Sequence, residues 1–169
     1  MTEHRREGTT PLPATVAAWF VLDLVPTERV PWWAARWLAD GHDGEALREL
    51  AGLNGRDPHA VRDLLPRALA DTGGVLPTTT VTAANEVFRE LAERCLSGIV
   101  GERSVVQQVE AVVISTHYNN DVIDLPLGAL YGTEYTWDGE WGRPIEELKA
   151  SVRACCAAQL RASRQQDRR

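Results

Sequence analysis

The chain has 169 residues, of which 44% are apolar and 25% are charged, and its formal net charge is −6 at pH 7. These values are those of an ordinary globular protein that buries a core. No apolar run approaches the roughly 20 residues that a membrane-spanning helix needs, and the first residues lack the apolar stretch of a signal peptide. We therefore expect a cytoplasmic protein that does not enter a membrane.

The three cysteines exclude a disulfide framework. Two of them, Cys155 and Cys156, are adjacent, and together with Cys95 they form no C-x-x-C pair. We expect all three to be reduced thiols that pack as small apolar side chains.

Apolar spacing, together with the positions of proline and glycine, predicts an all-α protein with about seven helices. Residues 1–12 are polar and are expected to form a disordered arm, and the arginine-rich residues 163–169 are expected to form a basic, disordered tail. Between them, residues 13–162 are predicted to form a single-domain bundle with one irregular region, at 117–142. The predicted helices cover 14–25, 31–40, 43–54, 58–71, 80–96, 102–116 and 145–162.

The helix at 31–40 has the clearest pattern. Trp33 and Trp37 are four residues apart, so they lie on one helix face with Ala34 and Leu38. Aromatic side chains of this size dominate the burial of a small core. We expect this helix to be the element against which its neighbours pack.

Residues 110–142 contain six acids, all three tyrosines and two tryptophans, but no lysine or arginine. Rings combined with carboxylates are typical of a surface that docks a basic partner. The alternative is that the rings pin an irregular loop to the helices and the acids only solvate it. The candidate partner-binding residues are Tyr118, Asp121, Asp124, Tyr131, Glu134, Tyr135, Trp137, Asp138, Glu140 and Trp141.

Residues 47–65 also match the spacing of a helix-turn-helix. Ala51, Gly55 and Val61 stand where that motif needs a small residue, a turn glycine and a β-branched residue. Asn54 and Arg56 depart from the motif, because those positions are normally apolar. The second helix also carries as many acids as bases on its outer face, so it attracts phosphate weakly. A structural helical hairpin is the preferred interpretation, and a DNA-binding regulator is an open alternative.

Sequence signatures of enzymes are absent, including phosphate-binding loops, nucleophile elbows and zinc-protease motifs. The best acid–base group is His117 with Asp121 and Asp124, since a nearby carboxylate orients an imidazole. The same three residues are a weak pattern for a metal site. We predict no catalytic residue, cofactor or metal, and a small enzyme centred on His117 and Asp121 is a further alternative.

The segment from Pro31 to Asp71, which contains WWAARWLADGHDGEALRELAGLNGRDPHAVRDLLPRALAD, resembles a small uncharacterised actinobacterial family of acidic helical proteins. The helix ending at Cys95-Leu96-Ser97-Gly98, the aromatic-acidic stretch and the closing helix are similar as well, so the resemblance covers most of residues 14–160. It implies a helical fold and carries over no activity or site residue. By analogy of class, small acidic proteins of this build are often immunity proteins or antitoxins. We therefore expect a non-catalytic module that binds a basic protein.

Overall fold

The computed structural model of the protein describes residues 9–137 and 144–168. All regular structure in these residues is helical, which confirms the predicted all-α class. There are nine α-helices among the described residues, because the region predicted to be irregular contains two short ones, α7 and α8. The elements are α1 (Pro13–Val21), η1 (Thr27–Arg29), α2 (Val30–Ala39), α3 (Glu45–Gly52), α4 (Pro58–Asp71), α5 (Thr80–Leu96), α6 (Glu102–Ser115), α7 (Asn120–Ile123), η2 (Gly128–Leu130), α8 (Glu134–Trp137) and α9 (Ile145–Gln166).

These elements belong to two compact units. Unit 1 comprises residues 9–17 and 25–76, and unit 2 comprises residues 18–24 and 77–168. The prediction that residues 13–162 fold as a single domain stays a prediction. Within the described ranges, no helix is both long enough and apolar enough to span a bilayer.

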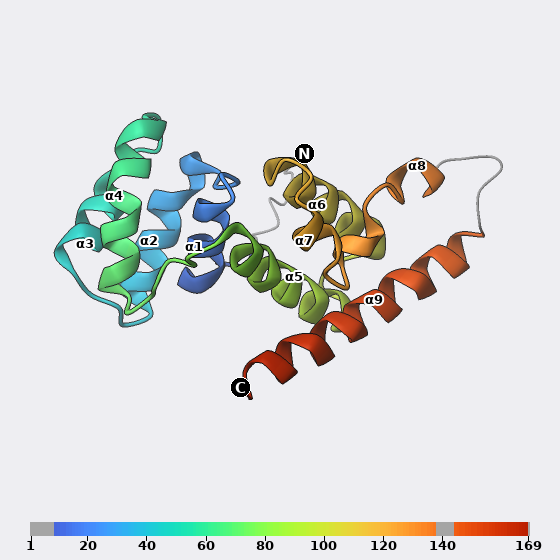
Figure 1. Ribbon diagram of the computed structural model, residues 1–169. Helices are drawn as coiled ribbons and strands as arrows, with labels where there is room; N and C mark the ends of the chain where they lie inside the picture. Colours follow the sequence, from blue (N-terminus) through green and yellow to red (C-terminus); the bar gives the residue numbers. More distant parts are fainter. Residues whose placement is uncertain (1–8, 138–143, 169) are drawn as a thin grey trace. The chain divides into compact units, whose positions relative to one another are not determined.

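In unit 1, helices α2, α3 and α4 pack side by side (Figure 1). Trp33, Ala34 and Trp37 are buried on one face of α2, as the spacing predicted. The indole Nε1 of Trp37 donates a hydrogen bond of 2.9 Å to the carbonyl oxygen of Pro11. The tryptophan helix is therefore an anchor of this unit, and it also holds residues that precede α1.

The first turn of α3 is capped by a side chain that comes from α4. The residue before α3 is Gly44, which has no side chain to bond the free N–H groups of the first turn. Asp71, at the end of α4, takes that role, since its Oδ2 accepts the N–H of Leu47 at 3.0 Å. Pro66 lies inside α4, and the helix continues through it from Pro58 to Asp71.

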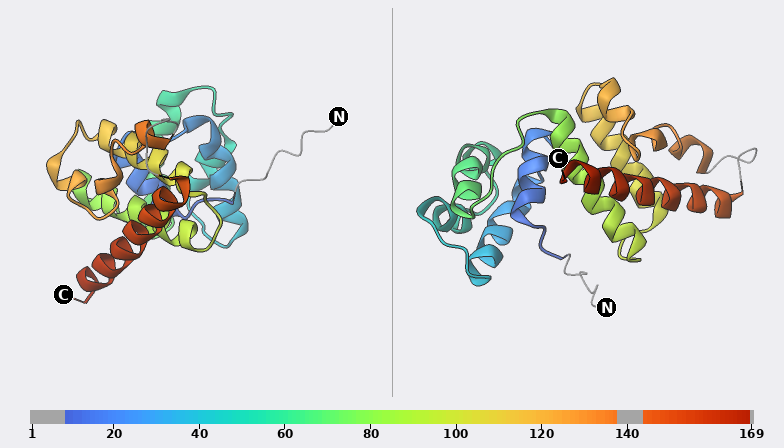
Figure 2. Two further views of the ribbon diagram at one scale, coloured as in Figure 1. Left: turned by 90° about the vertical axis from the view of Figure 1, so that its right-hand side faces the viewer. Right: turned by 60° about the horizontal axis from the view of Figure 1, so that its bottom comes forward.

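In unit 2, α9 packs across α5, and α6 packs against both (Figure 2). Phe88 of α5 is completely buried in the core between them. The run VVIS at 112–115 ends α6, within the helix predicted at 102–116, and Thr116 is its C-cap. The core positions of α6 are Val105, Val106, Val109, Val112 and Val113.

Two helix ends differ from their predicted positions. Helix α1 stops at Val21 instead of Val25, because Asp23 adopts a left-handed backbone with φ 58°. Helix α9 continues through Gln166 instead of ending near Ala162. Ser163 is buried near the end of α9, and its hydroxyl donates to the carbonyl of Gln159 at 3.0 Å.

Candidate functional site

The three tyrosines of the predicted site all reach the surface of unit 2. Tyr118, Tyr131 and Tyr135 are 54%, 37% and 81% exposed. The rings of Tyr118 and Tyr131 meet edge to face, with centroids 5.9 Å apart and an interplanar angle of 65°. Two residues that are far apart in sequence therefore form one aromatic feature. The edge-to-face arrangement of these two rings is one that aromatic pairs prefer.

The end of α6 places Tyr118 by an uncommon backbone conformation. His117 and Tyr118 both have left-handed dihedral angles, with φ 54° and 58°, where non-glycine residues are rare and strained. Their N–H groups bond back to the carbonyls of Ile114 and Val113, at 3.0 and 2.9 Å. These bonds end the helix and direct the chain outward before Asn119 caps α7.

The chain around η2 places Tyr131. The N–H of Tyr131 donates to the carbonyl of Gly128 at 3.0 Å. Gly128 passes so close to the end of α7 that an added Cβ would overlap the carbonyl oxygens of Val122 and Ile123. Only glycine fits there without movement of the backbone.

The acids around the tyrosines differ in what they contact. Asp121 and Asp124 are exposed, and neither forms an ion pair with a described residue. Glu134 is committed to α6, because its Oε1 accepts from Arg103 at 3.3 Å and from Gln107 at 3.1 Å. Asp121 and Asp124 therefore offer exposed carboxylates that no described side chain neutralises.

Glu110, on α6, lies beside the tyrosines and was not among the predicted site residues. The pKa of the Tyr131 hydroxyl is raised, chiefly because the group loses hydration. The nearby Tyr118, Glu110 and Tyr135 raise it further. One oxygen of Glu110 is shielded from water and has no hydrogen-bond partner among the described residues. Glu110, Tyr118, Tyr131 and Tyr135 are called the tyrosine patch below.

Trp137 is half-buried and packs against the core of unit 2. Its place among the partner-binding residues stays a prediction. The predicted site residues Asp138, Glu140 and Trp141 lie outside the described residues.

The possible metal site is not assembled. Among the described residues, no three His, Cys, Asp or Glu side chains gather in a way that could hold a metal ion, and this includes His117, Asp121 and Asp124. His117 is exposed at the end of α6. An imidazole there faces solvent.

The helix pair at 47–65 forms α3 and α4, joined by a tight turn at Gly55. This glycine is buried and left-handed, with φ 72°, and an added Cβ would lie 2.7 Å from the carbonyl oxygen of Glu28. The turn is therefore pressed against η1, and this contact is not the approach of two helices that a helix-turn-helix needs. Asp57 already bonds the free N–H groups at the start of α4, those of His59 and Ala60, and so occupies the place where a phosphate would bind.

The cysteines lie in the interface of α5 and α9. Cys95 and Cys156 are buried, Cys155 is half-buried, and all three are free. Burial raises the pKa of each thiol, and that of Cys156 to about 12. Thiolate is the reactive form, so these are structural cysteines.

We expect the folded protein to resist thiol reagents at pH 8, where about one part in ten thousand of the Cys156 thiol is ionised. Ellman's reagent measures this, with the same protein in guanidinium chloride as the control. All three thiols should react promptly once the chain unfolds. Fast reaction of Cys95 or Cys156 in the native protein would contradict the burial that the structure assigns to them.

A comparison with models of known families, with curated proteins and with solved structures finds no match to this chain.

Proposed function

We propose that this chain is a non-catalytic protein-binding module whose tyrosine patch, with Asp121 and Asp124, docks a basic partner. The observation that carries the proposal is the exposed edge-to-face pair of Tyr118 and Tyr131. Tyrosine is enriched in the energetic centres of interfaces, because its ring gives contact area at little cost in conformational entropy. Neutralisation of a basic toxin is one role that such a module serves.

The charges beside the tyrosines favour a positively charged partner. Asp121 and Asp124 carry unpaired negative charge in the segment that connects the two tyrosines. No lysine or arginine occurs between Glu110 and Gly142. Complementary charge speeds association and selects the partner, so a cationic surface is favoured over an acidic or neutral one.

A DNA-binding regulator is the second candidate, favoured by the tight turn at Gly55. The exposed side of α4 argues against it, because Asp57 and Asp63 offset Arg62 and Arg67. Affinity for DNA depends on counterions released by cationic side chains. Docking of a basic protein therefore accounts for more of the structure.

The docking proposal predicts that charge position matters more than net charge. We expect Asp121→Asn with Asp124→Asn to weaken binding of a fluorescein-labelled nona-arginine peptide by roughly three- to tenfold at low salt. Fluorescence anisotropy titrations measure this. The matched control is Asp40→Asn with Asp63→Asn, which removes the same charge from exposed sites in unit 1.

Equal weakening by the two double variants would mean that the peptide senses only overall charge, and the proposal would fail. The rings have a similar control. Tyr135→Ala should weaken binding, whereas Trp32→Ala, which removes a ring that is 45% exposed in unit 1, should not.

A further inference from the structure

Gln159 is a polar residue where α9 needs an apolar one. It is completely buried on the inward face that Leu148, Val152 and Cys156 also occupy. A primary amide taken out of water is unfavourable unless its donors and acceptor are bonded. Its partners therefore show what the residue does.

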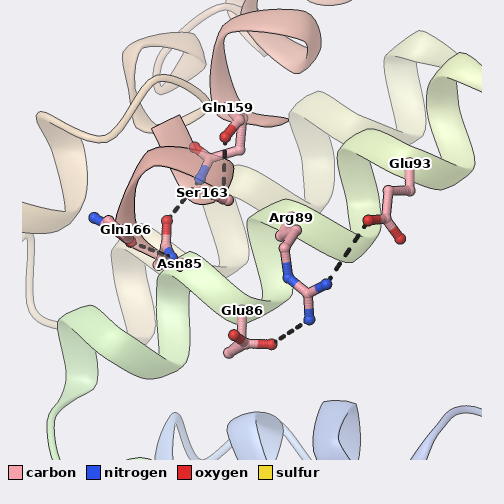
Figure 3. Close-up of polar contacts among 7 residues, drawn as sticks. All are labelled: Asn85, Glu86, Arg89, Glu93, Gln159, Ser163 and Gln166. Carbon is pink, nitrogen blue, oxygen red and sulfur yellow. Dashed lines mark hydrogen bonds and ion pairs between the residues drawn. The ribbon is translucent and has the colours of Figure 1, made fainter. Parts of the chain in front are cut away.

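The side chain of Gln159 links α9 to α5 and to the segment before η2, and Figure 3 shows its contact with Asn85 on α5. Its Nε2 donates to Oδ1 of Asn85 on α5 at 2.7 Å, and Nδ2 of Asn85 donates to Oε1 of Gln166 at 3.1 Å. Its Oε1 accepts the backbone N–H of Leu127 at 3.2 Å. A backbone N–H can only donate, so this contact fixes which end of the amide faces the loop.

Leu127 is the point at which this network reaches the candidate site. It is completely buried, and among the described residues its N–H bonds only to Gln159. The next residues form η2 and lead directly to Tyr131. The position of that ring is therefore tied to α9 by one side-chain hydrogen bond and to α7 by the close approach of Gly128.

We infer that Gln159 is a positioning residue for the tyrosine patch: it holds the η2 segment against α9 and α5, and thereby keeps Tyr131 beside Tyr118. It touches no partner itself. The inference rests on the proposed function only in taking the patch as the docking surface. The contact between Gln159 and the η2 segment can be tested without any partner.

The test is hydrogen–deuterium exchange of the full chain, followed by mass spectrometry of peptides that cover residues 118–133. Gln159→Leu keeps the size of the side chain and leaves the Leu127 N–H without an acceptor. Exchange in this segment should rise roughly tenfold or more, since an unbonded buried N–H favours local opening. Peptides from α2 to α4 should not change.

Gln159→Glu is the conservative variant. A carboxyl oxygen still accepts the Leu127 N–H, and Asn85 can turn its amide to donate to the other oxygen. We expect this variant to melt at a lower temperature but to keep the exchange of residues 118–133 near the wild-type rate. Ser163→Ala and Gln165→Leu are controls on the same helix, one buried and one exposed.

Wild-type exchange at residues 118–133 in Gln159→Leu would overturn the inference, and so would equal acceleration by Ser163→Ala, which would show only a general loosening of α9. The nona-arginine titration then separates the two proposals. If the wild type does not bind the peptide while Gln159→Leu still releases the η2 segment, the docking function fails and the positioning role stands. If binding depends on the patch but not on Gln159, the positioning role fails alone.

Discussion

Replacement of Trp37 with alanine should lower the free energy of unfolding of unit 1 by about 3–5 kcal/mol, the range for a large buried aromatic side chain. Trp37 is 2% exposed, and its helix α2 packs against α3 and α4. The substitution leaves a cavity in the centre of this unit. It also removes the donor to Pro11, which holds the residues before α1. Guanidinium chloride unfolding followed by circular dichroism measures the loss.

The same substitution at Trp32 is the matched control, because it removes an indole from the other side of the same helix. Trp32 is 45% exposed, and its ring lies beside the guanidinium of Arg36 at 5.8 Å. An exposed cation–π contact of this kind contributes about 0.5–1 kcal/mol. Similar losses for the two alanine variants would contradict the inward face assigned to α2.

Replacement of Gly128 with alanine should destabilise unit 2 by about 3 kcal/mol, at the upper end of the usual range for an overpacked site. The added methyl group would overlap the carbonyl oxygens of Val122 and Ile123. These are backbone atoms, so no side chain can rotate away to make room. The η2 segment would have to move, which would separate Tyr131 from Tyr118 as well as lower the melting temperature.

Gly101→Ala is the control for this second variant. Gly101 has a negative φ of −74°, and an added Cβ would meet nothing within 4 Å. Gly101 is the N-cap of α6, where glycine is preferred to alanine, so alanine there should cost no more than about 1 kcal/mol. Thermal unfolding by circular dichroism compares the two glycine variants directly. A Gly128→Ala protein as stable as Gly101→Ala would mean that η2 does not pack against α7.

Local rules predicted much of the fold because most helices here carry their own signals. The four-residue spacing of Trp33 and Trp37, and the cap at Asp57, can be read from neighbouring residues alone. The cap of α3 could not be predicted in this way. It comes from Asp71, which is distant in sequence, and Gly44 gives no sign of it.

The candidate site was predicted in part for the same reason. Composition singled out the segment that carries the exposed tyrosines, but it could not tell which acids are free. Glu134 is engaged by Arg103 and Gln107, a tertiary contact between α6 and α8. Gln159 did leave a signal, because it is a polar residue at a core position of α9.

The cap that Asp71 provides for α3 has a consequence for how unit 1 assembles. A short isolated helix is marginal in water, because its first turn is costly to nucleate. Here the acceptor that completes this turn is present only once the final turn of α4 has formed. The first turn of α3 and the last turn of α4 therefore form and unfold together, so the two helices behave as one cooperative folding element.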